Sequence, residues 1–503
     1  MATPSLPLLD EYELHNYSDD EYQDQEEGLL RSSPAPRVLS VPSLISFLGP
    51  RKLFRSYPLS RKRGPKGPRN LALFVKLWCL MWTGPLLLVL FVGLFMPSYV
   101  KYPEWYRDDI RGDQTEGLGN PGNEKIFIAA NIINEDLIRG RWGMAVKYLI
   151  HLLGSQNCFL SVYENDSGLG TKEALREFRD SISSNASIVS TTLPLSYIPT
   201  INPPFIGHAV TKRITYLATV RNLALLPLTY ALTPFYSPTP ISPGAEKTSL
   251  ENPDFHEVPF KPTGYSKVLF LNDVVFSPQE AIHLLFDTNR GDYAAACALD
   301  FINPIKYYDT FALRDTEGNG IGLPFYPFFT FGESRSAVLA GRESIPVKSC
   351  WGGMVAFDAT YFTRHEDTLQ PPVRFRSEME DAWDASECCL IHADIADPSR
   401  TFLNPYIRTS YDYGTFRLLG FARRIEKAWT YPHRFLSWIV GMPWANLRRG
   451  EKEGERYWTV DSSGKKVERI AKKGGFCGIR RLQVIEEGKG GARKWRKWKL
   501  PNA

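Results

Sequence analysis

The sequence predicts an α/β domain built on a largely parallel sheet and placed behind one apolar segment near the N-terminus. Two observations predict this architecture. From residue 125 onward, short apolar runs alternate with amphipathic stretches, a pattern typical of parallel strands with helices on both faces of the sheet. Residues 77–96 contain no charged residue, and about 20 apolar residues make a helix long enough to cross a bilayer.

The apolar segment, LWCLMWTGPLLLVLFVGLFM, is predicted to be a transmembrane helix. The alternative is a buried core helix, but Gly84 and Pro85 would be costly there and are tolerated in membranes. The segment begins too far from Met1 for a cleaved signal peptide. Lysine and arginine are concentrated in residues 51–76, so the positive-inside rule places the N-terminus in the cytosol and the rest of the chain in the lumen. This arrangement is a single-pass type II topology.

The composition separates a tail from a folded part. Of the 503 residues, 43% are hydrophobic and 23% are charged, which excludes a chain that is disordered throughout. The net charge of +5 is unevenly distributed and indicates no nucleic-acid partner. Residues 10–27 are acidic and rich in tyrosine, with little to build a core from. Residues 1–76 are therefore predicted to be a disordered cytosolic tail.

The first elements of the lumenal part follow a β-α-β-α order. Residues 125–130 (KIFIAA) are predicted to be a strand, and residues 139–153 have apolar positions at helical spacing. Residues 158–163 (CFLSVY) form a second apolar run, and residues 171–181 have a helical pattern. Ligands of such sheets bind beyond the carboxyl ends of the strands.

The next elements continue the alternation. Residues 213–226 are predicted to be a helix, and residues 237–263 are rich in Pro and Gly and are interpreted as a long surface loop. A strand at 267–271 (KVLFL), a helix at 279–287 and a strand at 293–299 follow. The predicted domains are therefore a stem at 97–123, an α/β domain at 124–435 and a basic C-terminal extension at 436–503, ordered in part.

Lumenal features of the sequence agree with this topology. Asn165 and Asn185 each begin an Asn-x-Ser triplet and are predicted glycosylation sites, whereas Asn16 begins a similar triplet on the cytosolic side. Six cysteines follow the segment, and an oxidising lumen permits disulfides, whose pairing the sequence leaves open. No Cys-x-x-Cys pair indicates a structural zinc site. These cysteines are Cys158, Cys297, Cys350, Cys388, Cys389 and Cys477.

Asp273 is the first candidate for chemistry. It follows the apolar run Val268 to Leu271, at the edge where an α/β sheet binds its ligand. A carboxylate at this edge suits a hard divalent ion that bridges two phosphates. The alternative is an aspartate that caps the turn before Pro278.

The strand that precedes Asp273 resembles the metal-binding strand of the fungal capsule-associated mannosyltransferase family, named for a cryptococcal α-1,3-mannosyltransferase. The resemblance covers residues 124–423 and rests on several long motifs in one order, which is more specific than any single motif. These motifs are VLFLNDVVF at 268–276, RITYLATVRN at 213–222, YYDTFALRD at 307–315, SCWGGM at 349–354 and SECCLIHAD at 386–394.

The resemblance implies a GT-A-like fold that binds a nucleotide sugar in an αβα domain, with an acidic metal site. The family's metal motif is Asp-x-Asp, and this chain has Leu271-Asn272-Asp273, so the first carboxylate is missing. Asp273 then becomes the expected metal ligand and a catalytic residue, with Asn272 as an oxygen donor. The expected cofactor is a divalent cation, Mn²⁺ or Mg²⁺, and a metal-independent reaction is the alternative.

The same resemblance implies an acceptor loop and a catalytic acid. Trp351, Gly352 and Gly353 are expected to form the loop, where glycine lets the backbone approach a sugar closely, although an ordinary tight turn would look the same. Glu387 is expected beside the reacting sugar. His392 is a second candidate metal ligand, with a structural histidine as the alternative.

The expected donor-binding residues come from two motifs. Arg213 and Arg221 are eight residues apart and share one face of the predicted helix, which suits contacts with a diphosphate, and a solvated helix face is the alternative. The second motif sets polar groups among aromatic residues, which suits a sugar, although salt bridges in a loop would have the same composition. The full set is Arg213, Arg221, Asn222, Asn272, Asp309, Arg314 and Asp315.

The predicted function is that of a hexosyltransferase, namely an α-1,3-mannosyltransferase that uses GDP-mannose and a glycan acceptor in cell-wall, capsule or glycoconjugate synthesis. Because donor and product are both α-linked in this family, the reaction would retain configuration, with Glu387 as nucleophile or as stabiliser of the oxocarbenium-like state. A Golgi or other secretory-pathway membrane is the expected location. The alternative is a catalytically silent scaffold of polysaccharide synthesis or export.

Overall fold

The computed structural model describes most of the chain after the predicted tail. The tail at 1–76 and the predicted loop at 237–263 lie outside the described residues, as does part of the predicted transmembrane helix. Residues 86–95 are helical, and within the described ranges no helix has both the length and the apolar character needed to cross a membrane. The described residues are 83–84, 86–107, 115–230, 264–363, 371–442, 449–487 and 493–500.

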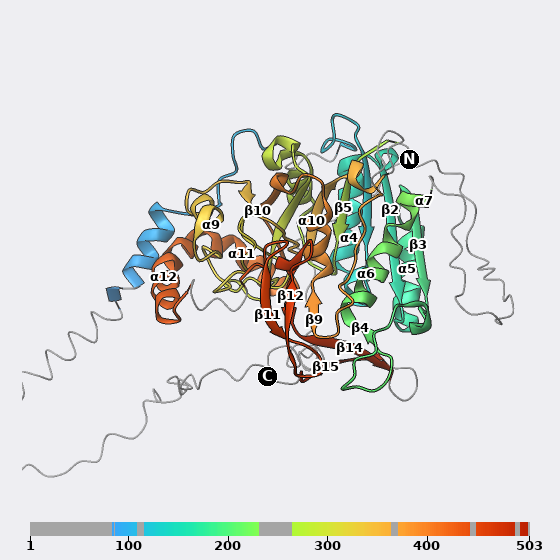
Figure 1. Ribbon diagram of the computed structural model, residues 1–503. Coiled ribbons are helices and arrows are strands. Elements are labelled where there is room, and N and C mark those ends of the chain that lie inside the picture. Colours follow the sequence, from blue (N-terminus) through green and yellow to red (C-terminus); the bar gives the residue numbers. More distant parts are fainter. Residues whose placement is uncertain are drawn as a thin grey trace, which may run out of the picture. The chain divides into compact units, whose positions relative to one another are not determined.

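The core is an eight-stranded mixed sheet with the order β3-β2-β1-β5-β8-β6-β10-β7 (Figure 1). Two of its strands, β7 (Ile345–Pro346) and β8 (Met354–Asp358), are antiparallel to their neighbours. The other six are parallel, which confirms the largely parallel α/β prediction. These are β1 (Lys125–Ala130), β2 (Cys158–Asn165), β3 (Asn185–Thr191), β5 (Tyr265–Leu271), β6 (Ala295–Phe301) and β10 (Thr401–Ser410).

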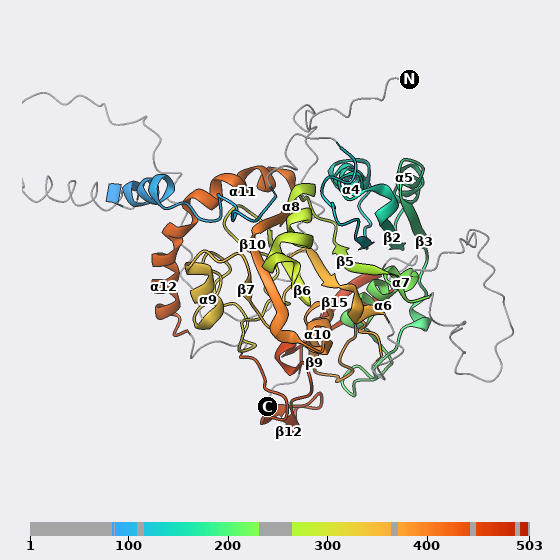
Figure 2. The same ribbon diagram turned by 90° about the horizontal axis from the view of Figure 1, so that it is seen from above.

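Helices cover both faces of this sheet. Viewed from above, α4, α5, α8 and α11 lie on one face, and α6, α7 and α10 lie on the other (Figure 2). Because both faces of the sheet are covered, all residues of β2 and β6 are buried. These strands are therefore mainly apolar and lack the alternation of apolar and polar residues that a half-exposed strand has. The helices are α3 (Glu135–Arg139), α4 (Arg141–Leu153), α5 (Leu169–Asp180), α6 (Arg213–Ala224), α7 (Leu226–Tyr230), α8 (Pro278–Ile282), α9 (Gly332–Leu339), α10 (Glu387–Asp394), α11 (Tyr413–Ile425) and α12 (Thr430–Ile439).

Most predicted elements are found close to their expected positions. The predicted strand at 125–130 coincides with β1, and the predicted helix at 279–287 is α8 followed by one π-helical turn, His283–Asp287. Ser277 caps α8 by accepting a hydrogen bond from the Glu280 N–H, 3.4 Å away. The predicted strand at 293–299 is displaced by two residues, because β6 extends through Asp300 to Phe301.

The C-terminal extension packs against the rest of the described chain through short strands. β14 (Leu482–Glu487) pairs with β15 (Arg493–Trp498) and with β4 (Thr211–Lys212), and β13 (Gly478–Arg480) pairs with β9 (Trp383–Ala385). β11 (Arg456–Val460) and β12 (Lys466–Ile470) form a separate hairpin. A Cys389–Cys477 disulfide joins the extension to α10, and a Cys297–Cys350 disulfide joins β6 to the turn before β8.

Candidate functional site

Polar side chains gather at one edge of the sheet, where β5, β6 and β10 end and the antiparallel β8 begins. Asn272 and Asp273 follow β5, Asp300 is the penultimate residue of β6, and Tyr411 follows β10. The Asn272 N–H donates to the Gly353 carbonyl at 2.9 Å, which joins the end of β5 to the start of β8. In α/β sheets this edge is the usual position of a ligand.

Arg221 is at the centre of one half of this site. Its Nε donates to Glu387 Oε1 at 3.1 Å and its Nη1 donates to Asn272 Oδ1 at 3.2 Å. The guanidinium lies over the Trp351 ring, 4.7 Å from the centroid, a favourable cation–π arrangement. Burial disfavours the charged guanidinium, but Cys388, Glu387 and Asp273 outweigh burial and raise the pKa of Arg221 above its usual value.

Three aromatic rings enclose this guanidinium. Phe270, Trp351 and Phe375 pack against one another with centroids 5.3 to 5.6 Å apart. Asn222 holds Phe375 in place, because its amide donates to the Phe375 carbonyl at 2.8 Å and accepts from the Phe375 N–H at 3.0 Å. Asn222, predicted to bind the donor, therefore positions the aromatic wall of the site.

A pair of carboxyl groups forms the other half. The Asp309 N–H donates to Asp300 Oδ1 at 3.1 Å, and the Tyr411 hydroxyl donates to Asp300 Oδ2 at 3.1 Å. Burial, followed by the charge of Asp309, raises the pKa of Asp300 to about 8. Burial also raises the pKa of Asp309, against backbone N–H groups that oppose the shift. Asp300 is therefore protonated at neutral pH.

Asp273 adds a third carboxyl group to this half. It is partly buried, and burial raises its pKa although Arg221 opposes the shift. After burial itself, the charges of Asp300, Asp273 and Asp309 are among those that raise the pKa of Tyr411, whose hydroxyl donates to Asp300. Sequence reasoning did not identify Asp300 or Tyr411. The sequence does contain a signal for Asp300, because it is an acid at the end of an otherwise apolar strand.

The local backbone conformation explains why the expected acceptor loop contains two glycines. Gly352 and Gly353 have φ values of +61° and +70°, which side chains rarely adopt. A Cβ on Gly352 would lie 1.8 Å from the Ala298 carbonyl oxygen, and one on Gly353 would lie 2.8 Å from Val274 Cγ1. Thr409 Oγ1 donates to the Gly352 carbonyl at 3.0 Å. The turn thus needs glycine to pack between β6 and the segment that carries Asp273.

Three predicted donor-binding residues make their contacts elsewhere. Arg213 lies over the Trp495 ring at 5.1 Å, and Arg314 Nε donates to the Phe476 carbonyl at 2.7 Å. Asp315 closes a turn by accepting the Asn319 N–H at 2.7 Å. These contacts attach the C-terminal extension and a loop, and they give no support to a donor-binding role.

His392 also lies apart from the carboxyl groups. Burial lowers its pKa to about 4, so the ring is neutral, and Nε2 donates to the Cys350 carbonyl at 2.6 Å. Within the described ranges, Cys297, Cys350 and His392 form the one group of three potential metal-ligating side chains, but its two cysteines are joined in a disulfide. This position gives no support to the metal-ligand prediction for His392.

The two predicted glycosylation sites differ in accessibility. Asn165 is buried at the end of β2, where its amide donates to Asp166 Oδ2 at 2.6 Å and also contacts the Tyr216 hydroxyl. Asn185 is exposed at the first residue of β3. Burial disfavours Asn165 as a glycan acceptor in the folded chain, whereas Asn185 is accessible.

Comparison with models of protein families shows to which family this chain belongs. A family described as Cryptococcal mannosyltransferase 1 matches residues 125–394. The chain belongs to this family. The matched segment includes Arg221, Asp273, the Asp300–Asp309 pair and Glu387, and it places the chain among the glycosyltransferases. A search of curated proteins finds no match.

Solved structures give weaker likenesses. A mannosyltransferase from Pyrobaculum calidifontis, in complex with GDP-Man and Mn²⁺, is 14% identical, with 75% of this chain and 85% of that chain covered and a TM-score of 0.31. Glucosyl-3-phosphoglycerate synthase from Mycobacterium tuberculosis, in complex with Mn²⁺, UDP and glucosyl-3-phosphoglycerate, is 11% identical, with 74% and 92% covered and a TM-score of 0.31.

Proposed function

We propose that this protein is a GT-A-like α-1,3-mannosyltransferase that moves mannose from GDP-mannose to a glycan acceptor in cell-wall, capsule or glycoconjugate synthesis. Family membership supports the class of reaction. The observation that carries the proposal is the cluster of Asp273, Asp300 and Asp309 beside the Arg221–Glu387 pair, at the carboxyl edge of the parallel strands. Donor identity and linkage rest on the family.

The carboxyl groups fit a hard divalent cation, Mn²⁺ or Mg²⁺. Such ions take oxygen ligands and are commonly held by one or two carboxylates together with substrate phosphates. Asp273 would provide one carboxylate, and within the described chain Asp309 Oδ2 is buried without a hydrogen-bond partner. When bound, the cation would stabilise the negative charge of the departing diphosphate. Asn272 is a poorer candidate ligand, because its Oδ1 already accepts from Arg221 and Trp351.

Glu387 is the group that we assign to the reacting sugar. It is the first residue of α10, where the helix dipole favours a negative charge, and it is paired with Arg221 at 3.1 Å although it is only 3% exposed. The buried carboxylate would stabilise positive charge at the anomeric carbon or attack that carbon, with retention of configuration.

The deciding experiment measures transfer and donor hydrolysis by the full chain with a panel of nucleotide sugars, with and without Mn²⁺. We expect turnover of GDP-mannose that depends on the cation and is abolished in Asp273→Ala, with an α-linked product by NMR. A folded chain that binds a donor but turns over none of the panel would instead favour a silent scaffold. The missing first acid of the metal motif is the observation behind that alternative.

For location, we propose a type II protein of the Golgi or another secretory-pathway membrane. Support comes from the uncharged segment at 77–96 and the basic residues before it. Protease added to sealed microsomes should remove the N-terminal tail and leave the catalytic domain intact. Loss of the catalytic domain without detergent would contradict this topology.

A further inference from the structure

The helices α11 and α12 present an apolar face to solvent. Leu418 and Phe421 are three residues apart on α11, and Tyr431, Phe435 and Trp438 recur at spacings of four and three on α12. At these spacings the side chains share one side of each helix. We call this set the α11–α12 face, which comprises Leu418 (52% exposed), Phe421 (62%), Tyr431 (67%), Phe435 (60%), Trp438 (75%) and Ile439 (57%).

The other side of these helices is packed, so the exposed face belongs to ordered elements. Leu419 and Ala422 of α11 are buried, as are His433 and Ser437 of α12. The His433 ring packs against Phe325, with centroids 5.2 Å apart. A contiguous apolar patch of this kind on a soluble protein usually marks an interaction surface.

The exposed charges carried by the two helices themselves have one sign, while the exposed acid Asp412 caps the start of α11. From residue 413 to residue 442, the exposed charged side chains are Arg417, Arg424 and Arg434. The acid within this range, Glu426, is buried and paired with Arg408 at 2.8 Å. Exposed arginines on helices with an apolar face complement the phosphates of a lipid headgroup layer.

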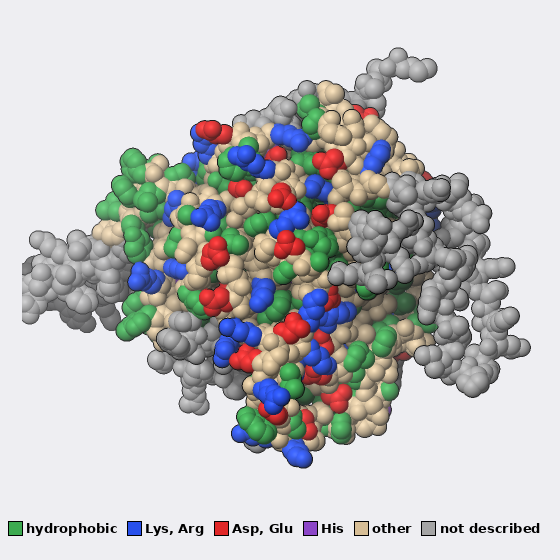
Figure 3. Space-filling view, turned by 45° about the horizontal axis from the view of Figure 1, so that its top comes forward, with side chains coloured by type: hydrophobic (Ala, Val, Ile, Leu, Met, Phe, Trp, Pro, Cys, Tyr) green, Lys and Arg blue, Asp and Glu red, His purple; other side chains and the backbone are tan. Residues whose placement is uncertain are grey.

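The face also continues into the predicted membrane segment. Residues 86–96 pack against α11, because a Cβ on Gly93 would lie 3.1 Å from Ile425 Cγ2 and the Ser98 N–H donates to the Arg423 carbonyl at 3.0 Å. Figure 3 shows hydrophobic side chains gathered on the side of the molecule that carries these helices. The exposed apolar residues of this segment are Leu86, Leu87, Leu88, Leu90, Phe91, Leu94, Phe95 and Met96.

We propose that the α11–α12 face lies in the headgroup region of a phospholipid bilayer and holds the sheet domain against the membrane surface. Trp and Tyr on an amphipathic helix are typical of this interfacial layer. A second copy of the chain fits less well, because a two-fold contact through this face would bring arginines against arginines. The proposal is independent of the transferase chemistry above.

The test measures the immersion of a nitroxide label in the full chain reconstituted into phosphatidylcholine vesicles containing phosphatidylserine. The label is placed by Trp438→Cys in a Cys79→Ser background, and the matched control is Trp458→Cys on β11, which is 65% exposed. We expect the ratio of collisions with lipid-soluble oxygen to collisions with a water-soluble nickel complex to be several-fold higher at position 438 than at position 458. The Cys79→Ser chain without an added cysteine, treated with the same label, serves as the blank.

Two outcomes would overturn the proposal. Equal accessibility of both labels to the nickel complex would place the face in water. Low accessibility of the 438 label to both reagents would indicate a protein partner or a second copy. A further variant, Phe421→Glu with Phe435→Glu, should return the 438 label to the accessibility of the control. If the label in this variant stayed immersed, the apolar face would not be the cause of the contact.

Discussion

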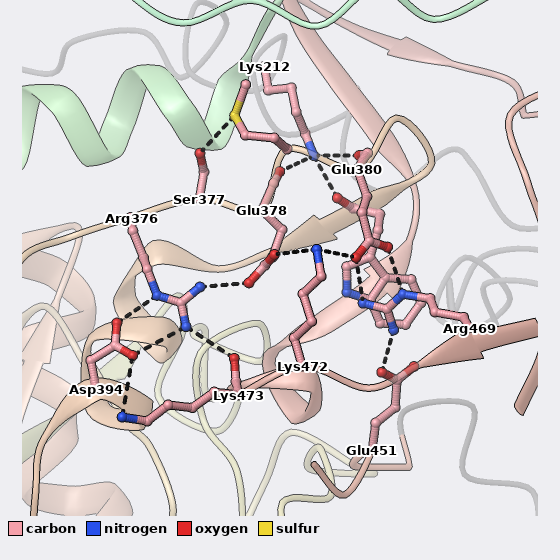
Figure 4. A network of polar contacts seen from close by, with 12 residues as sticks. Lys212, Arg376, Ser377, Glu378, Glu380, Asp394, Glu451, Arg469, Lys472 and Lys473 are labelled. Carbon is pink, nitrogen blue, oxygen red and sulfur yellow. Dashed lines mark hydrogen bonds and ion pairs between the residues drawn. The ribbon is translucent and has the colours of Figure 1, made fainter. Parts of the chain in front are cut away.

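The candidate site and the polar network of Figure 4 both contain buried or half-buried acids and arginines, but they pair them differently. In the network, Arg376 Nε contacts Asp394 Oδ2 and Arg469 Nε contacts Glu380 Oε2, each at 2.6 Å. Burial alone would raise the pKa of Glu380, but Arg469 and Lys472 hold it below its usual value. Burial does raise the pKa of Glu451, the second partner of Arg469, to about 7, whereas at the site the pKa values of all three aspartates, Asp273, Asp300 and Asp309, are raised.

The difference lies in how many cations face the acids. The network gives each carboxylate an arginine or lysine and joins the C-terminal extension to the segment at 376–380. At the site Arg221 pairs with Glu387, and within the described residues Asp273, Asp300 and Asp309 take part in no ion pair. Such an excess of acid destabilises the fold, and clusters of raised pKa values are characteristic of functional sites. The network stabilises the fold, whereas the unpaired acids of the site suit the ligand-binding role that we propose for it.

Asp273→Asn tests this contrast with the largest expected effect. The change keeps size and hydrogen bonding but removes the charge, so we expect a loss in kcat of about 10² to 10³, as for other electrostatic groups of catalytic sites. Glu380→Gln in the network is the matched control and should leave kcat near the wild-type value. Steady-state transfer assays at saturating Mn²⁺ measure both. Near-normal, metal-independent transfer by Asp273→Asn would favour a turn-capping role.

Arg221→Met should have the next largest effect, on stability. Glu387 would be left buried without its partner, and losing one member of a buried pair costs about 3–5 kcal/mol. Arg376→Met, in the partly exposed network, should cost about 1 kcal/mol or less. Denaturant melts of the full chain in detergent compare the two. The double variant Arg221→Met with Glu387→Gln should recover part of the lost stability. If Arg221→Met and Arg376→Met cost the same, the site and the network would not differ in this respect.

Asp300→Asn should alter the pH dependence of stability. Because the pKa of folded Asp300 is raised to about 8, the folded state retains a proton that the unfolded state loses near pH 4. The contribution of Asp300 to the free energy of unfolding is therefore complete below pH 4. It is lost as the pH rises toward 8, at up to about 1.4 kcal/mol per pH unit. We expect the variant to lose less stability than the wild type between pH 5 and pH 8 in thermal melts. If the stability of wild type and variant changed with pH in the same way, the raised pKa of Asp300 would be contradicted.

Glu380→Gln should show the opposite sign with a smaller effect. The pKa of folded Glu380 is lowered, so its contribution is present above the unfolded pKa and disappears as pH falls through the folded pKa. Its side chain is 30% exposed, and the expected cost at pH 7 is under about 1 kcal/mol. Melts at pH 7 and pH 3 should differ between wild type and variant only at the higher pH. A cost that persists at pH 3 would show that packing, and not charge, is lost.

Local patterns predicted the strands well and the site only in part. The apolar runs of β1 and β5 gave their positions, and Asp273 followed from its place after β5. Asp300 was missed because an acid within an apolar run is usually interpreted as part of the core. Arg314 was assigned to a donor because sequence does not show that its guanidinium reaches the Phe476 carbonyl, 162 residues away. The Arg221–Glu387 pair spans 166 residues, a separation that local periodicity does not report.

The pairing of the C-terminal strands also sets an order of events during synthesis. β14 pairs with β4, which precedes α6 and Arg221, while Cys477 is joined to α10, which carries Glu387. Lys212, a buried residue of β4, donates to the carbonyls of Glu378 and Trp383. Both halves of the Arg221–Glu387 pair are thus supported by residues that leave the ribosome last. A chain that stops before residue 477 would contain every predicted catalytic residue and still lack the partners that hold them, so assembly of the site has to follow translation of almost the whole protein.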